Sequence, residues 1–210
     1  MVFSNVVFLF IFLPLVIITY FFARRELQNY ILLFFSLIFY AWGEPKYVVI
    51  MLFSIFINYI FGLLVAKFRD NKQLNKIVLF SAIVCNLFIL GYYKYANFLL
   101  ENINTFFSLN IQIEPVVLPI GISFYTFQAM SYVIDVYRKE GDVQKNPFNL
   151  ALYVALFPQL IAGPIVRYNE IAAQIKKRFV NIEKFSEGIK LFIIGLTKKV
   201  LIANQVGFIA

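Results

Sequence analysis

Histidine is absent from this 210-residue chain, and cysteine occurs only once. The lack of histidine excludes a histidine general acid or base, and a histidine metal ligand, within these residues. The single cysteine, Cys85, permits no intramolecular disulfide and no paired-cysteine metal site. Its place in an apolar run is typical of a small buried side chain. Glycine-rich phosphate-binding loops are also missing. We therefore predict neither a metal nor a cofactor for this chain.

Charged residues are scarce as well. They make up 14% of the chain, whereas hydrophobic residues make up 61%, including 26 Phe and 13 Tyr. A soluble domain is usually about half apolar and about a quarter charged. We therefore expect an all-α protein, polytopic in the membrane, in which residues 1–210 form a single integral membrane domain.

The net charge is +8, which in a soluble protein would suggest nucleic-acid binding. In this chain the basic residues lie mostly between apolar stretches, where Lys and Arg hold loops on the cytoplasmic side. The charge therefore predicts contact with a lipid bilayer, and no nucleic-acid partner.

Four uncharged stretches open the chain, at residues 6–22, 27–43, 47–66 and 77–93. Each approaches the roughly 20 residues that a helix needs to cross a bilayer. With the N-terminus outside, the inner loops carry Arg24, Arg25, Lys67, Arg69, Lys72 and Lys76. The outer loops then carry only Lys46 and Lys94, which favours this orientation. Residues 95–114 mix polar and apolar side chains and predict a short interfacial helix and loop.

The next uncharged stretch, residues 115–134, contains polar side chains. Gln128, Ser131, Asp135 and Arg138 follow steps of three, four and three residues, so they share one helical face. A polar face within a membrane usually meets protein or a wet cavity. The pattern fits either a functional path or simple helix bracing, with Asp135 paired to Arg138 or Lys139.

Residues 146–166 are interrupted by Pro158, Gly163 and Pro164. Because bare backbone cannot face lipid, this central segment should be broken or re-entrant and buried in protein. Arg167 lies just beyond it. Residues 171–187 predict a basic interfacial helix on the inner leaflet. A further helix should run from residue 188 to residue 210, and its lack of a closing cap is typical of a truncated N-terminal half.

Four motifs, in order along the chain, resemble the alginate O-acetyltransferase-like subgroup of membrane-bound O-acyltransferases. They are residues 40–45 (YAWGEP), 118–138 (LPIGISFYTFQ through DVYR), 157–165 (FPQLIAGPI, with Arg167) and 195–200 (GLTKKV). Asn204 departs from the pattern, since relatives often carry an acidic residue there. The family's catalytic histidine lies in the later half of such proteins, so no catalytic residue is assigned in this chain.

The resemblance implies a bacterial inner- or plasma-membrane enzyme that is multi-pass. It would move an acyl group, in this subgroup acetyl, from a cytoplasmic acyl donor to hydroxyls of an extracytoplasmic polysaccharide acceptor. It also implies extracytoplasmic or carrier protein partners. The candidate residues that line or brace the substrate path are Gln128, Asp135, Arg138, Gln159 and Arg167. The fragment alone should be inactive. Two alternatives stay open: a transporter or flippase-like component, in which broken polar helices are also common, and a membrane scaffold.

Overall fold

The computed structural model describes residues 5–109, 111, 114–160 and 166–209, and every regular element in them is helical. The elements are η1 (Phe8–Phe12), α1 (Leu13–Phe22), α2 (Gln28–Gly43), η2 (Pro45–Tyr47), α3 (Val48–Lys67), α4 (Lys72–Phe107), α5 (Ile122–Arg138), α6 (Pro147–Ala155), α7 (Phe157–Leu160), α8 (Tyr168–Lys176), α9 (Ile182–Thr197), η3 (Lys198–Ala203) and α10 (Asn204–Ile209). The prediction of an all-α fold is thus confirmed for the described residues.

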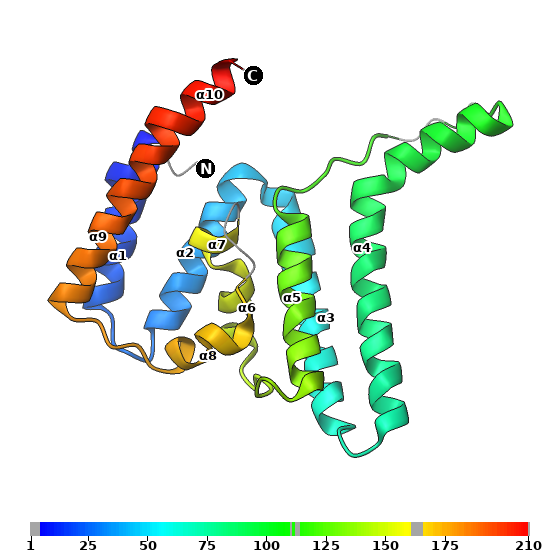
Figure 1. Cartoon of the computed structure of the whole chain (residues 1–210), viewed down its shortest axis with the longest axis horizontal. Coiled ribbons are helices and arrows are strands. Elements are labelled where there is room, and N and C mark those ends of the chain that lie inside the picture. Colours follow the sequence, from blue (N-terminus) through cyan, green and yellow to red (C-terminus); the bar gives the residue numbers. More distant parts are fainter. Residues whose placement is uncertain (1–4, 110, 112–113, 161–165, 210) are drawn as a thin grey trace.

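Two described helical stretches are long and apolar enough to cross a membrane, Pro45–Lys67 and Lys72–Phe107, and Phe8–Phe22 is a shorter apolar helix. At 1.5 Å per residue, the 36 residues of α4 extend about 54 Å. That length exceeds a hydrocarbon core of about 30 Å, so part of α4 must lie outside it. In Figure 1 the last turns of α4 bend away from its lower part.

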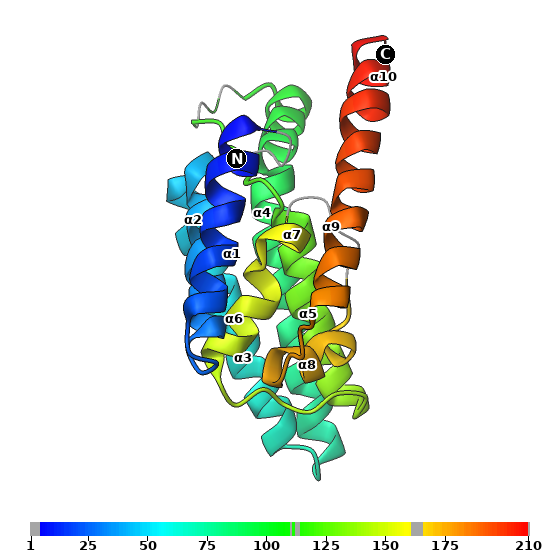
Figure 2. The same ribbon diagram turned by 90° about the vertical axis from the view of Figure 1, so that its left-hand side faces the viewer.

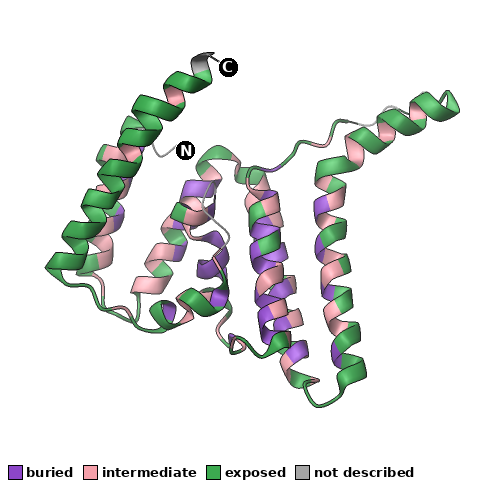
Figure 3. Ribbon diagram, in the orientation of Figure 1, coloured by how far each residue is buried: buried purple, intermediate pink, exposed green. Residues whose placement is uncertain are grey.

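Helix α5 packs against α3 and α4, and α6 packs against α2 and α3 (Figure 1). Buried residues concentrate on α5 and α6, whereas α4 is buried along only one side (Figure 3). The close approach of α3 to α5 depends on Gly62. A Cβ built there would lie 2.6 Å from the Tyr132 ring, so only glycine leaves room for that ring.

An aromatic cluster fastens the N-terminal helix to the rest. Phe8, Phe12, Phe39 and Phe157 are buried against one another, with the rings of Phe12 and Phe157 5.6 Å apart. These residues come from η1, α2 and α7, so the cluster joins the first two helices to the broken segment. Such ring pairs contribute roughly 0.5–1.5 kcal/mol each beyond their buried area.

Three boundaries differ from the sequence prediction. The helix predicted to end near residue 93 continues to Phe107, because residues 94–107 contain neither Pro nor Gly to stop it. Residues 115–121 are not helical, and α5 begins only at Ile122, after Pro115, Pro119 and Gly121 at φ +76°. The single interfacial helix predicted over 171–187 is two helices, because Asn181 caps the start of α9 by accepting from Lys184 N at 2.8 Å.

The C-terminal stretch α9–η3–α10 stands apart from the other helices, on the opposite side of the view from α1 (Figure 2). None of the residues of α9 or η3 is buried, and several large apolar side chains are exposed, among them Leu191, Ile193 and Leu201. The run predicted over 188–210 is therefore helical as far as Ile209.

Candidate functional site

The broken segment lies against the polar face of α5. Helix α6 ends at Ala155, Leu156 turns the chain with ψ 115°, and α7 follows from Phe157. The interruption predicted near Pro158 is therefore present. Residues 161–165, which complete the predicted segment, lie outside the described residues. A break of this kind frees backbone groups that a continuous helix would pair.

Two side chains satisfy those freed groups. The Gln128 amide Nε2 donates to the Tyr153 carbonyl oxygen at 2.8 Å. On the other side of the break, the Phe157 backbone N–H donates to Ser36 Oγ of α2 at 3.2 Å. Gln128 and Ser36 are both buried. They give the Tyr153 carbonyl and the Phe157 N–H hydrogen-bond partners inside the protein, which an apolar medium could not supply.

The predicted residues Gln128 and Gln159 are brought together. Gln128 Nε2 lies 3.5 Å from Gln159 Oε1, at the limit of a hydrogen bond. Gln159 and Tyr153 also line a cavity of about 150 Å³ between α2, α6 and α8. Ser131, on the same face of α5, donates its hydroxyl to the Gln128 carbonyl oxygen at 2.8 Å. At Gln128 and Ser131 the polar face of α5 thus meets protein, and Gln159 connects it to this cavity.

Three tyrosines in edge-to-face contact extend this network toward α8. Tyr168 lies between Tyr132 and Tyr153, with ring centroids 5.1 and 5.2 Å away. Gln144 binds two of them: its backbone N–H donates to the Tyr132 hydroxyl at 3.0 Å, and its Nε2 donates to the Tyr168 hydroxyl at 2.6 Å. Tyr153 donates its hydroxyl to the Val166 carbonyl oxygen at 2.8 Å. Burial raises the pKa of Tyr168 above its usual value, so this hydroxyl stays protonated at neutral pH.

The other three predicted residues form a separate charged group at the end of α5. Arg138 Nε lies 2.9 Å from Glu140 Oε1, and Arg167 Nη1 lies 3.9 Å from Glu140 Oε2. Both arginine side chains are about half exposed, so these pairs contribute at most about 1 kcal/mol each. Asp135 is buried, and among the described residues its Oδ2 has no hydrogen-bond partner.

The pairing of Asp135 with Arg138 or Lys139, which the bracing alternative included, is not found among the described ion pairs. The end of α5 explains why. Lys139 adopts φ 63°, and the N–H groups of Lys139 and Glu140 return to the carbonyl oxygens of Val136 and Asp135. This Schellman turn reverses the chain after α5. Glu140, rather than Asp135, is thereby the residue paired with Arg138.

The turn motif at residues 40–45 holds the start of α5. The Tyr40 hydroxyl donates to the Ile120 carbonyl oxygen at 3.1 Å, and the Ile120 N–H donates to Glu44 Oε2 at 2.8 Å. Gly121 follows, and a Cβ built on it would lie 2.9 Å from the Leu160 carbonyl oxygen. Three stretches singled out in the sequence therefore meet at one place.

Sequence reasoning missed several members of the site, namely Ser36, Glu140, Gln144, Tyr153 and Tyr168. The tyrosines have no helical spacing relative to one another. Ser36 lies 121 residues from Phe157, whose N–H donates a hydrogen bond to it. Glu140 was the exception, because an acidic residue two positions after Arg138 is a nearby candidate for an ion pair.

Curated proteins named as O-acetylases or O-acetyltransferases are similar to this chain over its whole length. The chain is 40% identical to a probable alginate O-acetylase AlgI of Pseudomonas syringae pv. tomato, covering 100% of this chain and 41% of that protein. It is 38% identical to the Pseudomonas aeruginosa protein of the same name, with the same coverage. It is 31% identical to a peptidoglycan O-acetyltransferase of Helicobacter pylori, covering all of this chain and 46% of that protein.

No family model and no solved structure matches the chain. The chain spans less than half the length of the curated relatives that it matches. The similarity nevertheless covers every described helix, and it includes the four motifs, three of which meet at the start of α5 and the broken segment. The predicted resemblance to O-acetyltransferases is therefore confirmed: over its whole length the chain is similar to proteins named alginate O-acetylase and peptidoglycan O-acetyltransferase.

Proposed function

We propose that this chain forms part of a membrane O-acyltransferase that transfers acetyl groups from a cytoplasmic donor to hydroxyls of an extracytoplasmic polysaccharide. The observation that carries the proposal is the similarity, over the whole of this chain, to part of proteins named alginate O-acetylase and peptidoglycan O-acetyltransferase. The names of these relatives do not favour a transporter or a scaffold.

The polar network between α5 and the broken segment is the proposed wall of the substrate path. Gln128 braces the break at Tyr153, and Gln159 presents its amide to the cavity beside it. The charged group around Glu140 lies at the opposite end of α5 from Gly121, where it would shape the entrance for an anionic donor. In this proposal Gln128 is a positioning residue, and Gln159 is the residue closest to the path.

The general base belongs elsewhere in the complete enzyme. Acyl transfer requires a base that removes the proton of the acceptor hydroxyl as it attacks the acyl carbon. The resemblance assigns this role to a histidine, and this chain contains none. We therefore expect residues 1–210 alone to show no transferase activity.

The proposed orientation places the N-terminus outside the cytoplasm. Its support is the clustering of basic loops: the α1–α2 turn, the α3–α4 turn and α8 all lie at the same end of the bundle (Figure 1). Arg24, Arg25 and Lys67 lie at that end, whereas Lys46 lies beyond the other end of α2. The excess of Lys and Arg would hold this end at the cytoplasmic face of a bacterial membrane. In this arrangement α6 and α7 enter from the cytoplasmic end, and α8 lies back at that end, which would make the broken segment re-entrant.

A chimera tests the proposed function. Residues 1–210 would replace the matching region of the Pseudomonas aeruginosa alginate O-acetylase in a strain that lacks its own copy. We expect ester-linked acetyl groups on the secreted alginate to be restored. A chimera carrying the matching region of the Pseudomonas syringae relative controls for the effect of the exchange itself. The proposal fails if that control restores acetylation and the chimera with residues 1–210, at equal membrane level, does not.

The same chimera tests the site residues one at a time. Alanine at Gln128 or Gln159 should lower acetylation strongly, and alanine at Asp135, Arg138 or Arg167 should lower it to a smaller degree. Gln73→Ala, at an exposed position of α4, is the matched control. If all five variants acetylate alginate as well as the control does, the proposed path is wrong.

A further inference from the structure

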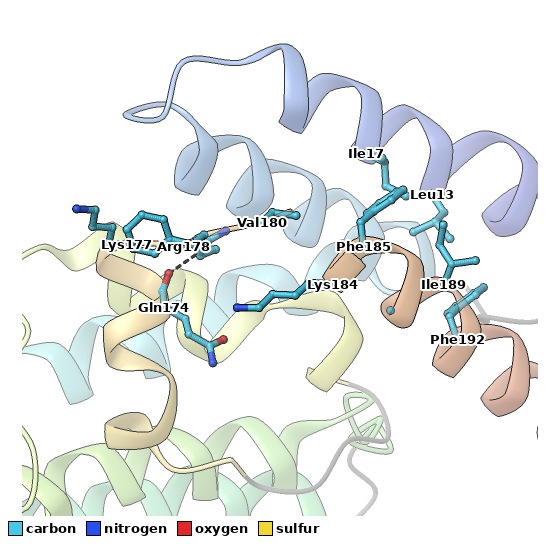
Figure 4. Close-up of a pocket in the computed structure, with 12 residues that line it drawn as sticks. Leu13, Ile17, Gln174, Lys177, Arg178, Val180, Lys184, Phe185, Ile189 and Phe192 are labelled. Atoms are coloured by element: carbon cyan, nitrogen blue, oxygen red, sulfur yellow. Dashed lines mark hydrogen bonds between the residues drawn. The ribbon is translucent and has the colours of Figure 1, made fainter. Parts of the chain in front are cut away.

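A groove with two unlike ends lies between α1, the loop after α8, and α9. Its volume is about 670 Å³, within the range of small-molecule sites. The apolar end is lined by Leu13 and Ile17 of α1 and by Phe185, Ile189 and Phe192 of α9. The polar end is lined by Gln174, Lys177, Arg178 and Lys184. Figure 4 shows the two sets separated along the groove, with the Lys184 side chain directed toward the polar end.

The polar end is strongly basic. It carries three cations, and none of the described residues that line the groove is acidic. Arg178 is fixed in place, because its guanidinium donates to Asn29 Oδ1 and to the Gln174 carbonyl oxygen. Lys184 forms no described ion pair, and the Lys177 ammonium lies 5.0 Å from the Phe179 ring. The arrangement provides an anion with one cation held by hydrogen bonds and two cations that form no described ion pair.

The two ends lie in the order of a phospholipid. The basic end lies beside the α1–α2 turn with Arg24 and Arg25, and the apolar end runs along α1 toward its middle. A phospholipid has the same order, with its phosphate at the interface and its acyl chains in the hydrocarbon. The ring contact between Phe21 and Phe185, at 5.6 Å, joins α1 to α9 beside this groove.

We propose that this groove binds an anionic phospholipid, with the phosphate between Lys177, Arg178 and Lys184 and one acyl chain between α1 and α9. A soluble phosphate would leave the apolar end unused. A second apolar helix would leave the cations buried without partners, which is costly. Only a ligand with both an anionic head and an apolar tail matches both ends. The bound lipid would hold α9, which contacts few other helices, against α1. This inference depends on the membrane location and not on the acyl-transfer chemistry.

Native mass spectrometry of the detergent-purified protein tests the proposal. The protein would be titrated with dioleoyl phosphatidylglycerol or with the zwitterionic dioleoyl phosphatidylcholine. We expect a single tightly bound phosphatidylglycerol and no comparable phosphatidylcholine adduct. Each lysine near an anionic lipid contributes about 1 kcal/mol, so a Lys177→Gln/Lys184→Gln variant should bind phosphatidylglycerol at least about tenfold more weakly. Lys190→Gln/Lys198→Gln removes the same charge outside the groove and should bind as the parent does.

A second variant blocks the groove without changing its charge. Gly188 lines the groove, and a Cβ built on it would meet nothing within 4 Å. Gly188→Phe should therefore fold and fill the apolar end, abolishing the adduct. Gly195→Phe, equally open on the same helix but outside the groove lining, is its control. Helix content by circular dichroism verifies that each variant is folded.

Three results would overturn the proposal. The first is equal binding of the two lipids by the parent. The second is equal weakening by the groove variants and by their controls, which would indicate a general effect of surface charge. The third is displacement of the lipid by millimolar inorganic phosphate, which would indicate a simple anion site that makes no use of the apolar end.

Discussion

A pair of asparagines should be a principal link between α3 and α4, the two helices long and apolar enough to cross a membrane. Asn58 and Asn86 are both buried, and each donates its Nδ2 to the Oδ1 of the other, at 2.8 and 2.9 Å. The second N–H of each amide donates to a carbonyl oxygen of its own helix, that of Ser54 or Ala82. Every amide hydrogen of the pair is therefore used. Replacement of one partner leaves the other with an unpaired amide in an apolar setting.

The magnitude follows from the two bonds between the helices. Side-chain hydrogen bonds within membranes contribute about 0.6 kcal/mol on average and up to about 1.7 kcal/mol. Asn58→Leu, which loses both bonds at similar volume, should thus lower the free energy of unfolding by about 1–3 kcal/mol. Asn86→Leu should cost about the same. The double variant leaves no unpaired amide, so it should cost clearly less than the sum of the two single changes.

The assay is an unfolding titration in mixed micelles with increasing SDS, followed by circular dichroism. The four proteins of the double-mutant cycle would be compared with Asn102→Leu. Asn102 is exposed on α4 and bonds only to its own helix, at the Phe98 carbonyl oxygen, so its change should be within about 0.5 kcal/mol. Strict additivity of the two single variants, or single variants indistinguishable from the control, would refute a hydrogen-bonded link.

Three further changes address the backbone, in the same titration. Gly62→Ala should destabilise by about 1–3 kcal/mol, because the new Cβ would lie 2.6 Å from the buried Tyr132 ring. Gly121→Ala should cost at least about 1–2 kcal/mol, because φ is +76° and the Leu160 carbonyl oxygen is 2.9 Å from the Cβ position. Lys139→Gly should instead stabilise the fold by up to about 1 kcal/mol, because it removes the strain of a lysine in the left-handed conformation. The greater conformational freedom of glycine in the unfolded chain partly offsets this gain.

Gly91→Ala is the common control for the two glycine predictions. Gly91 lies within α4, and a Cβ built on it would meet nothing within 4 Å. Alanine should therefore stabilise the helix by up to about 1 kcal/mol. If Gly62→Ala or Gly121→Ala behaved like Gly91→Ala, close packing would not explain those glycines.

Much of the helical architecture could be predicted from local sequence. The apolar stretches predicted α2 and α3 to within about two residues, because a segment in lipid must pair its backbone internally and only a helix does so within one stretch. The spacing of Gln128, Ser131 and Asp135 indicated one face of α5 for the same local reason. Boundaries were less predictable where capping decided them, as at Asn181.

The sequence named five candidate site residues but did not predict how they are grouped. Gln128 and Gln159 meet across 31 positions, whereas Arg138 and Arg167 belong to a different group around Glu140. The grouping follows from where α6 breaks and how the chain turns after Lys139. Neither the break nor the turn produces a periodic pattern in the sequence.

The sequence by itself determined the membrane character, the helical class, the resemblance to O-acetyltransferases and the absence of histidine from this chain, because these follow from composition, short-range periodicity and conspicuous motifs. Only the tertiary structure decided that Ser36 would satisfy a backbone group 121 residues away, that Asn58 would pair with Asn86, and that α1 and α9 would enclose a basic groove. Such contacts depend on which helices pack against one another, and the formation of a helix within each segment does not determine its neighbours.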